Sequence, residues 1–356
     1  MTNPMQTKSR FWLYASGAAL LLLVLGAVAL WKSNNFVSIE SIDAYVCSGT
    51  IDGEPLLAEL NFAKRPCRTG LVVFPDGTQM LIPGHRVEGE EHVWDIVDDN
   101  CQLKGGLRGR WDSTHGTFNG LICSTAMRDS RPRNVTLKRV AQVVQMRDVS
   151  GFRIWTFGER RVIDSTIPRF DPTSRFVSVS NEWLGVDWTF DWERALPSVE
   201  KLFTKSDDGE EYYRLNYSLT VYDPEILSTM TTAIGVGVTP GQSSNLQSWV
   251  IKNDHVENVR LDDALHESVE VSSGGSRAKL SFRDVVVARS RANGFEFPIE
   301  KWAEGELRPV ISSFAFERAG MRFRTEWPKP GEIVIPWSDL QPLIKPDGPA
   351  ARYLKK

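Results

Sequence analysis

The sequence predicts a β-rich α+β protein with an N-terminal transmembrane helix, then a small antiparallel β-barrel-like domain and a larger α+β domain. Three observations lead to this fold class. Residues 11–31 are continuously apolar, residues 40–148 contain short strand-like segments separated by turns, and residues 151–356 mix strands with a few helical segments. The composition, 41% hydrophobic and 24% charged, is typical of folded chains.

The apolar segment begins at Phe11, ends at Trp31 and contains no charged residue. A helix of about 20 apolar residues spans the hydrocarbon core of a bilayer, which is ~30 Å thick. Lys8 and Arg10 precede the segment, so the positive-inside rule places residues 1–10 in the cytoplasm. We therefore expect a protein that crosses the bacterial inner membrane once, with a cytoplasmic N-terminus and its bulk in the periplasm.

A cleaved signal peptide is the alternative for this segment. Ala27 and Ala29 provide the small residues that a signal peptidase accepts. However, the apolar part of a secretory signal has about 7 to 15 residues, which is shorter than the segment found here. Trp12, Tyr14 and Trp31 also lie near the segment ends, where aromatic rings favour the membrane interface. Both observations favour a retained anchor.

Between residues 40 and 148, turn residues such as Gly53 and Gly77 separate strand-like segments. Eight strands are expected, at residues 43–51, 54–62, 69–74, 78–83, 92–97, 101–111, 116–123 and 134–144. Leu56, Ala58, Leu60 and Phe62 have the period-two spacing of one strand face. Closure into a barrel, or packing as a sandwich, removes the unpaired edges that an open sheet of such strands would expose.

Four cysteines lie in the β-barrel-like domain: Cys47, Cys67, Cys101 and Cys123. An even, clustered set in an exported segment is typical of disulfides. Because Cys101 opens one predicted strand and Cys123 closes the next, both are expected at the same end of neighbouring strands. We favour pairing of Cys101 with Cys123 and of Cys47 with Cys67, although four cysteines allow three connectivities. A zinc site is the alternative, but the close C-x-x-C pairs typical of one are missing.

Strand-like segments continue beyond a predicted domain boundary at residues 148–151. The expected strands are residues 152–157, 175–180, 186–192, 212–223, 228–238, 248–253, 268–273, 278–288, 310–317, 320–327 and 332–337. Helical segments are expected near residues 195–203, 261–267 and 338–344. Strands with a minority of helices predict an α+β layer architecture for residues 151–356.

Motifs near the C-terminus carry a family resemblance. A strand with Gly-Met-Arg-Phe at residues 320–323 precedes EIVIPWSDL at residues 332–340, and VRLDDAL at residues 259–265 follows a pair of strands. The region from Tyr212 to Leu343 resembles the exported C-terminal module of RsiV-type anti-sigma factors, which also occurs in PdaC-type peptidoglycan deacetylases.

In those relatives the module faces cell-wall glycan or lysozyme. The resemblance therefore implies peptidoglycan or a lysozyme-like hydrolase as the envelope partner, and it brings no individual binding residue with it. The metal-dependent domain of the deacetylases, with its His and Asp ligands, has no counterpart in this sequence, so the resemblance implies no metal.

An aromatic stretch at residues 182–193 is the best candidate for a ligand-binding surface. Its ligand-binding residues are expected to be Trp183, Trp188, Phe190, Trp192, Asp187 and Asp191. On a strand, alternation places positions 188, 190 and 192 on one face and the carboxylates on the other. Sugar rings stack on flat aromatic faces, and carboxylates accept hydrogen bonds from hydroxyl groups. The alternative is an aromatic face buried in the core, with the carboxylates in water.

The sequence contains no nucleophile elbow, phosphate-binding loop or dinucleotide fingerprint, so we expect no catalytic residue and no cofactor. His85 and His92, with nearby carboxylates, are the densest group of potential metal ligands, but their spacing fits a solvated acidic hairpin better than a metal site. With a net charge of -3, nucleic acid is not an expected partner. We expect a non-catalytic binding protein; an envelope enzyme acting on glycan or lipid, or a structural tether, is the alternative.

A topology reporter tests the predicted anchor. Alkaline phosphatase fused after Lys356 is expected to be active in bacterial cells, because this enzyme needs the oxidising environment outside the cytoplasm. Deletion of residues 11–31 should abolish that activity. A β-galactosidase fusion at the same position is the control, and an active β-galactosidase with an inactive phosphatase would place the chain in the cytoplasm.

Overall fold

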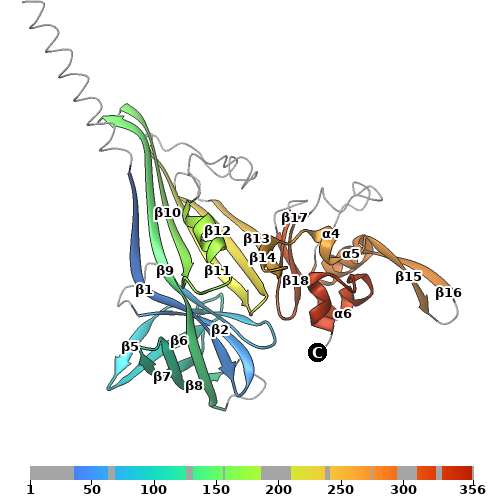
Figure 1. The fold of residues 1–356 in the computed structure, drawn as a ribbon, viewed down its shortest axis with the longest axis horizontal. Helices are drawn as coiled ribbons and strands as arrows, with labels where there is room; N and C mark the ends of the chain where they lie inside the picture. The colour runs from blue at the N-terminus through green and yellow to red at the C-terminus, as the bar shows by residue number, and fades with distance from the viewer. Residues whose placement is uncertain are drawn as a thin grey trace, which may run out of the picture.

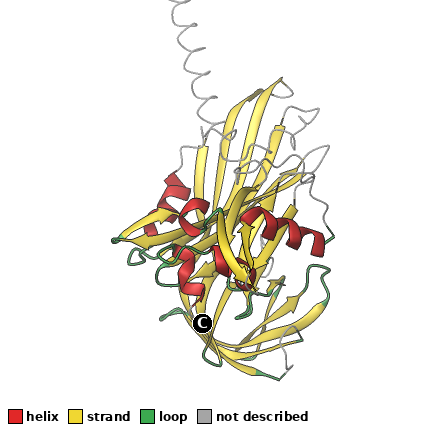
Figure 2. Cartoon of the chain, turned by 90° about the vertical axis from the view of Figure 1, so that its right-hand side faces the viewer, coloured by secondary structure: helices red, strands yellow, loops and turns green. Residues whose placement is uncertain are grey.

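The computed structural model describes residues 36–62, 69–125, 131–154, 157–185, 210–236, 241–273, 276–294, 311–325 and 331–354. Strands dominate this part of the chain, and its helices are short (Figure 2). None of the helices in these ranges is long and apolar enough to cross a membrane, and the predicted anchor at residues 11–31 lies outside them.

Within the described residues, eight antiparallel strands close into a barrel (Figure 1). They are β1 (Phe36–Ile51), β2 (Glu54–Asn61), β3 (Gly70–Val73), β4 (Gln79–Ile82), β6 (Glu91–Val97), β7 (Leu103–Asp112), β8 (Thr117–Ser124) and β9 (Arg133–Ile154). Each strand pairs with the next in this order, and β1 closes the barrel against β9. All eight correspond to predicted strands. The short β5 (His85–Glu88) was not among them, but it pairs with β6 in the hairpin expected for this segment.

The interior of the barrel is filled by alternate residues of its strands, as period-two patterning requires. Leu56 and Leu60 of β2 face inward with Trp94, and each is 0% exposed. Gly109 and Gly120 lie opposite each other on β7 and β8, and a Cβ on either would lie 2.8 Å from the Phe118 ring. The Phe118 ring therefore fits inside the barrel because the two residues beside it are glycines, which have no Cβ.

Strand β9 continues beyond the barrel and becomes part of a second sheet (Figure 1). That sheet adds β10 (Phe157–Phe170), β11 (Glu210–Tyr222), β12 (Ile226–Val236), β13 (Gly241–Lys252) and β14 (His255–Asn258). β10 pairs antiparallel with β9 and parallel with β11. In the described part of the chain the barrel and this sheet thus form one 14-stranded sheet. The predicted domain boundary at residues 148–151 lies inside β9, which both halves share.

The remaining elements form a smaller C-terminal layer. They are α4 (Leu261–Ala264), β15 (Ser268–Ser273), β16 (Ser276–Ser281), α5 (Phe282–Ala292), β17 (Ile311–Phe316), β18 (Gly320–Thr325), β19 (Gly331–Pro336), α6 (Trp337–Leu340), η3 (Gln341–Leu343) and η4 (Pro349–Leu354). β17, β18 and β19 form a separate sheet in these ranges. Phe316, Phe323 and Leu340, each 0% exposed, belong to the core between this sheet and the helices.

Two predicted strands are helical instead. Residues 175–180 enter α2 (Val177–Gly185), and the predicted strand at residues 278–288 divides into the end of β16 and the start of α5. A capping box explains the second case, because Ser281 accepts a hydrogen bond from the Asp284 N–H while the Asp284 carboxylate accepts one from the Ser281 N–H. The predicted strand at 186–192 and the predicted helix at 195–203 lie outside the described residues.

The cysteines do not form the predicted disulfides. Cys101 and Cys123 lie at the same end of β7 and β8, as predicted, but no bridge joins them. Cys123 pairs with Gly106, five residues beyond Cys101. Cys101 itself lies in the turn before β7, with a φ of 60°. Cys47 is a free thiol buried inside the barrel, and burial raises its pKa. Its predicted partner, Cys67, lies outside the described residues.

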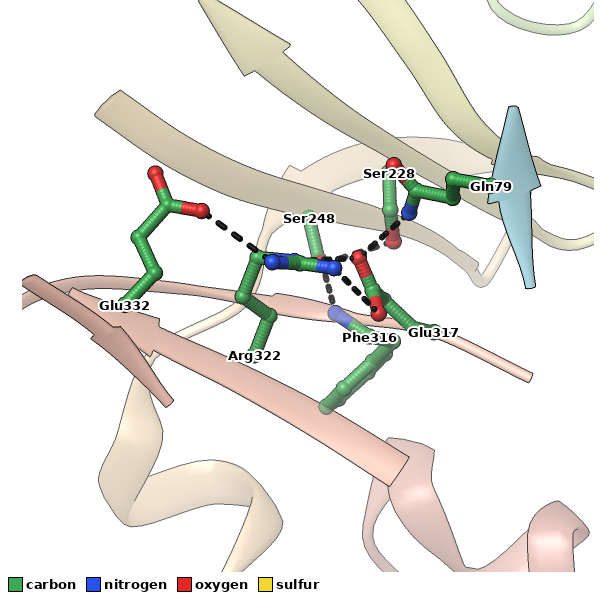
Figure 3. Close-up of polar contacts among 7 residues, drawn as sticks. All are labelled: Gln79, Ser228, Ser248, Phe316, Glu317, Arg322 and Glu332. Carbon is green, nitrogen blue, oxygen red and sulfur yellow. Dashed lines mark hydrogen bonds and ion pairs between the residues drawn. The ribbon is translucent and has the colours of Figure 1, made fainter. Parts of the chain in front are cut away.

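A buried carboxylate links the C-terminal sheet to the barrel (Figure 3). Glu317, which follows β17, is 3% exposed, and its Oε1 lies 2.6 Å from Nε of Arg322. Nη1 of Arg322 also lies 3.1 Å from the Glu332 carboxylate. From the barrel strand β4, Gln79 donates its Nε2 to Oε1 of Glu317 at 2.8 Å. The Glu317 carboxylate is therefore shared by the barrel and the C-terminal sheet.

A serine pair ties the same sheet to β12 and β13 (Figure 3). The hydroxyl groups of Ser228 and Ser248 lie 2.8 Å apart, and Ser248 Oγ accepts the Phe316 N–H at 2.8 Å. Close backbone packing adds a third contact, because a Cβ on Gly77 would lie 2.7 Å from the Ala319 Cβ. The turn between β17 and β18 is thus held by the barrel on one side and by β12 and β13 on the other.

Substitution of Glu317 tests the ion pair. Glu317→Gln is expected to lower the free energy of unfolding by about 3 kcal/mol, because it leaves the largely buried Arg322 guanidinium with less compensating charge. Urea denaturation measures the change. Glu90→Gln is the matched control, since its ion pair with Arg110 is exposed and its loss should have no measurable effect. Equal stability of Glu317→Gln and wild type would contradict the stabilising role of the ion pair.

Candidate binding site at the barrel mouth

Half-buried aromatic and charged side chains gather at one end of the barrel. In an antiparallel barrel the start of one strand lies beside the end of the next, which brings inward-facing terminal residues of several strands together. The residues that make up this barrel mouth are Tyr45, Phe62, His85, His92, Trp111 and Arg139. The pairing of β1 with β9 shifts register between Ser41 and Tyr45, where both strands leave the barrel.

Phe62 lies at the centre of the mouth. Its ring centroid is 5.1 Å from those of both Trp94 and Trp111, and 5.2 Å from that of His92. Tyr45 stacks against Trp111 with centroids 5.4 Å apart and an interplanar angle of 19°. Trp94 forms the buried floor, and its Nε1 donates to the Asn61 carbonyl at 2.9 Å. The rings support one another and leave Tyr45 and Trp111 partly open to solvent.

Charged groups flank the aromatic rings. The Arg139 guanidinium lies over the Tyr45 ring, with its central carbon 5.6 Å from the ring centroid. Burial raises the pKa of Tyr45, and the nearby Asp43 carboxylate, which accepts a hydrogen bond from the Tyr45 hydroxyl, raises it further. The mouth thus offers a guanidinium as donor and a carboxylate as acceptor beside flat apolar faces.

The two histidines of the predicted acidic hairpin meet in the mouth. His85 Nε2 and His92 Nδ1 lie 2.9 Å apart, and the rings are stacked. Burial lowers the pKa of both imidazoles, and their mutual repulsion when charged lowers that of His85 further. The carboxylates of the hairpin do not join the histidines in a metal site but form ion pairs with arginines, as in the contact of 2.9 Å between Glu90 and Arg110. Across the described ranges, no three His, Cys, Asp or Glu side chains are grouped to hold a metal ion.

The predicted aromatic stretch lies elsewhere. Trp183 is in α2, only 5% exposed, and packs against Tyr217 and Trp249 with ring centroids 5.3 Å and 5.5 Å away. Trp183 itself is therefore part of an aromatic core. The other predicted site residues, Trp188, Phe190, Trp192, Asp187 and Asp191, lie outside the described residues.

Sequence reasoning did not identify the barrel mouth as a site. Its residues come from six strands or strand ends. Each is the last inward-facing residue of its strand at this end of the barrel. The alternation along β2 that ends at Phe62, just after the strand, and the alternation along β7 that ends at Trp111 carry the signal. Aromatic residues at the last inward position of several predicted strands would have pointed to this end of the barrel.

Comparisons with known proteins give a partial likeness. No family model and no curated protein matches the chain. One solved structure, a DUF3298 family protein from Pseudomonas aeruginosa PAO1, is 10% identical with a TM-score of 0.35, over 58% of this chain and 95% of that one. Another DUF3298 family member, from Bacteroides fragilis NCTC 9343, is 10% identical with a TM-score of 0.35, over 61% and 98% of the two chains. A likeness at this level assigns no function.

The histidine pair predicts a pH dependence of stability. Because burial lowers both pKa values, the unfolded chain takes up more protons than the folded one once the pH falls below about 6.5. Stability is therefore fully present above about pH 6.5 and is lost as the pH falls toward the lowered pKa values. Urea midpoints between about pH 7.5 and 5.5 should fall less in His85→Gln/His92→Gln than in wild type. The exposed His255→Gln is the control; identical slopes for wild type and the double variant would contradict the prediction.

Proposed function

We propose that this protein is a membrane-anchored, non-catalytic binding protein of the bacterial envelope, and that the barrel mouth is its binding surface for cell-wall glycan. The Tyr45–Trp111 stack carries the proposal. The two rings stack on each other at an interplanar angle of 19°, and both remain partly exposed. Sugar rings stack on exposed aromatic rings of this kind. Ligand sites also occur preferentially in the mouths of β-barrels.

The charged groups of the mouth fit a glycan that carries carboxylates. Peptidoglycan bears carboxylates on its lactyl ethers and peptide stems, and the Arg139 guanidinium suits such groups because it binds them in a planar geometry. The Asp43 carboxylate has more acceptor sites than its bond from Tyr45 uses, so it is available to sugar hydroxyl groups. Ring stacking and these polar contacts together would hold the glycan, and neither requires a reactive group, as expected of a non-catalytic binding site.

The length of β1 supports a role at a distance from the membrane. The predicted anchor ends at Trp31, and β1 begins at Phe36. At about 3.3 Å per residue, the strand covers roughly 30 Å between Phe36 and Tyr45. The barrel mouth can therefore stand beyond the lipid headgroups. Peptidoglycan lies in that space, away from the membrane surface.

A lysozyme-like hydrolase is the second candidate partner. This version rests on the resemblance of residues 212–343 to the RsiV and PdaC module, and strands β11, β13, β17, β18 and β19 lie where that resemblance places strands. An enzyme acting on glycan or lipid, or a structural tether, lacks a comparable observation in its favour.

Co-sedimentation with purified peptidoglycan sacculi tests the glycan proposal. The full-length protein in detergent is expected to pellet with sacculi, and Tyr45→Ala/Trp111→Ala should bind at least about tenfold more weakly, because loss of a central aromatic anchor costs about 2 kcal/mol or more. Leu103→Ala is the matched control, since Leu103 is 69% exposed and begins β7 at the end of the barrel opposite Trp111.

Unchanged sedimentation of the double variant, in protein whose unfolding midpoint shows that it remains folded, would exclude the mouth as the glycan platform. The same preparation passed over immobilised lysozyme at physiological salt distinguishes the partners. Retention on lysozyme without sedimentation on sacculi would replace the glycan version by the hydrolase version.

A further inference from the structure

A second candidate site lies on the outer wall of the barrel, away from the mouth. A cleft of about 590 Å³ separates the barrel from the β11–β12 turn and the C-terminal segment. Ser48 of β1 and Lys138 of β9, which are register partners, form its barrel side. Alternation along β9 directs Lys138 outward and its neighbour Arg139 inward, so the cleft and the mouth use opposite faces of the barrel wall.

The cleft has an excess of positive charge. Among its described lining residues, Lys138, Arg175 and Arg318 are cationic, and Asp223 is the one carboxylate. That carboxylate is already engaged, because it lies 3.1 Å from Arg352 and accepts the backbone N–H groups of two residues in its own turn. Arg175 is engaged as well, since it lies 3.0 Å from the Asp254 carboxylate. Among the described residues, Lys138 and Arg318 are therefore the lining cations without an ion pair.

Arg318 is the central cation. It follows the anchored Glu317, and its Nη1 donates to the backbone carbonyl of Pro55. In the part of the chain that the structure describes, no carboxylate lies within ion-pair distance of this guanidinium. Burial lowers its pKa, and the Asp223 carboxylate, beyond that distance, opposes the shift. A half-buried guanidinium with unused N–H donors is a ready partner for a planar anion.

Tyr353 supplies an unused donor on the same cleft. Its ring is held against Trp337, with centroids 4.3 Å apart and an interplanar angle of 7°. The hydroxyl oxygen is buried and has no hydrogen-bond partner among the described residues. Buried hydroxyl groups nearly always have a partner, so an isolated one beside a cationic cleft points to a ligand that supplies the acceptor.

We propose that this cleft binds a small amphipathic anion. The carboxylate or phosphate of the ligand sits between the Arg318 guanidinium and the Tyr353 hydroxyl, with Lys138 adding long-range attraction. The apolar part of the ligand contacts Phe176 and Val221, which line the rest of the cleft.

Calorimetric titration of the full-length protein in lipid nanodiscs tests this site. The probes are hexanoate, hexyl phosphate and the uncharged 1-hexanol, which share one apolar chain and differ in the headgroup. At least one anionic probe is expected to bind at least about tenfold more tightly than hexanol. The tighter of the two anions identifies the headgroup.

Two variants link binding to the named groups. Arg318→Gln should abolish detectable binding of the anionic probes, and Tyr353→Phe, which keeps the stacked ring, should weaken it about fivefold. Arg277→Gln is the matched control, because this arginine lies on β16, outside the cleft, with its side chain 82% exposed. Thermal unfolding confirms that each variant is folded.

Equal binding of hexanol and the anions would overturn the proposal, as would absence of binding of all three probes or unchanged anion affinity in Tyr353→Phe. None of these outcomes bears on glycan sedimentation, since Tyr45 and Trp111 do not line the cleft.

Discussion

The continuity of β9 is the constraint on which the architecture depends. The first half of this strand closes the barrel against β1 and β8, and its second half pairs with β10 to begin the second sheet. A single extended strand cannot bend freely between two sets of backbone hydrogen bonds, so the barrel and the second sheet are fixed relative to each other. Ala141, Val143 and Met146, each 0% exposed, bury this junction and make it part of one core.

The Glu317 anchor adds the third part of the molecule to this frame. Its carboxylate accepts a hydrogen bond from Gln79 of the barrel and pairs with Arg322 of the C-terminal sheet. Ala319 packs closely against Gly77, where a Cβ would lie 2.7 Å from the Ala319 Cβ. Arg318, between these two contacts, is thereby held over the outer barrel wall. The cationic cleft is a direct product of this docking. The barrel mouth, in contrast, is built by the barrel strands, their ends and β5, without the C-terminal sheet.

Local patterning predicted the barrel well, because its information lies within each strand. The series through Leu56, Leu60 and Phe62 reports which residues face inward, and residues such as Gly77 mark the turns. The same reasoning failed at residues 278–288, where a capping box between Ser281 and Asp284 overrides a strand-like pattern. It also failed for Cys101 and Cys123. Whether two residues on paired strands lie opposite each other depends on the register of the pairing, and the order of the strands does not supply that register.

The sequence by itself determined the eight barrel strands, the inward-facing residues of those strands and the apolar segment that predicts an anchor, since each is a property of contiguous residues. Only the tertiary structure decided that β9 joins two sheets, that Tyr45 stacks on Trp111, and that Arg318 and Tyr353 share a cleft. The physical reason is that these contacts join residues far apart in the chain. Their meeting depends on strand register, barrel closure and the docking of the C-terminal sheet, none of which has a local signature.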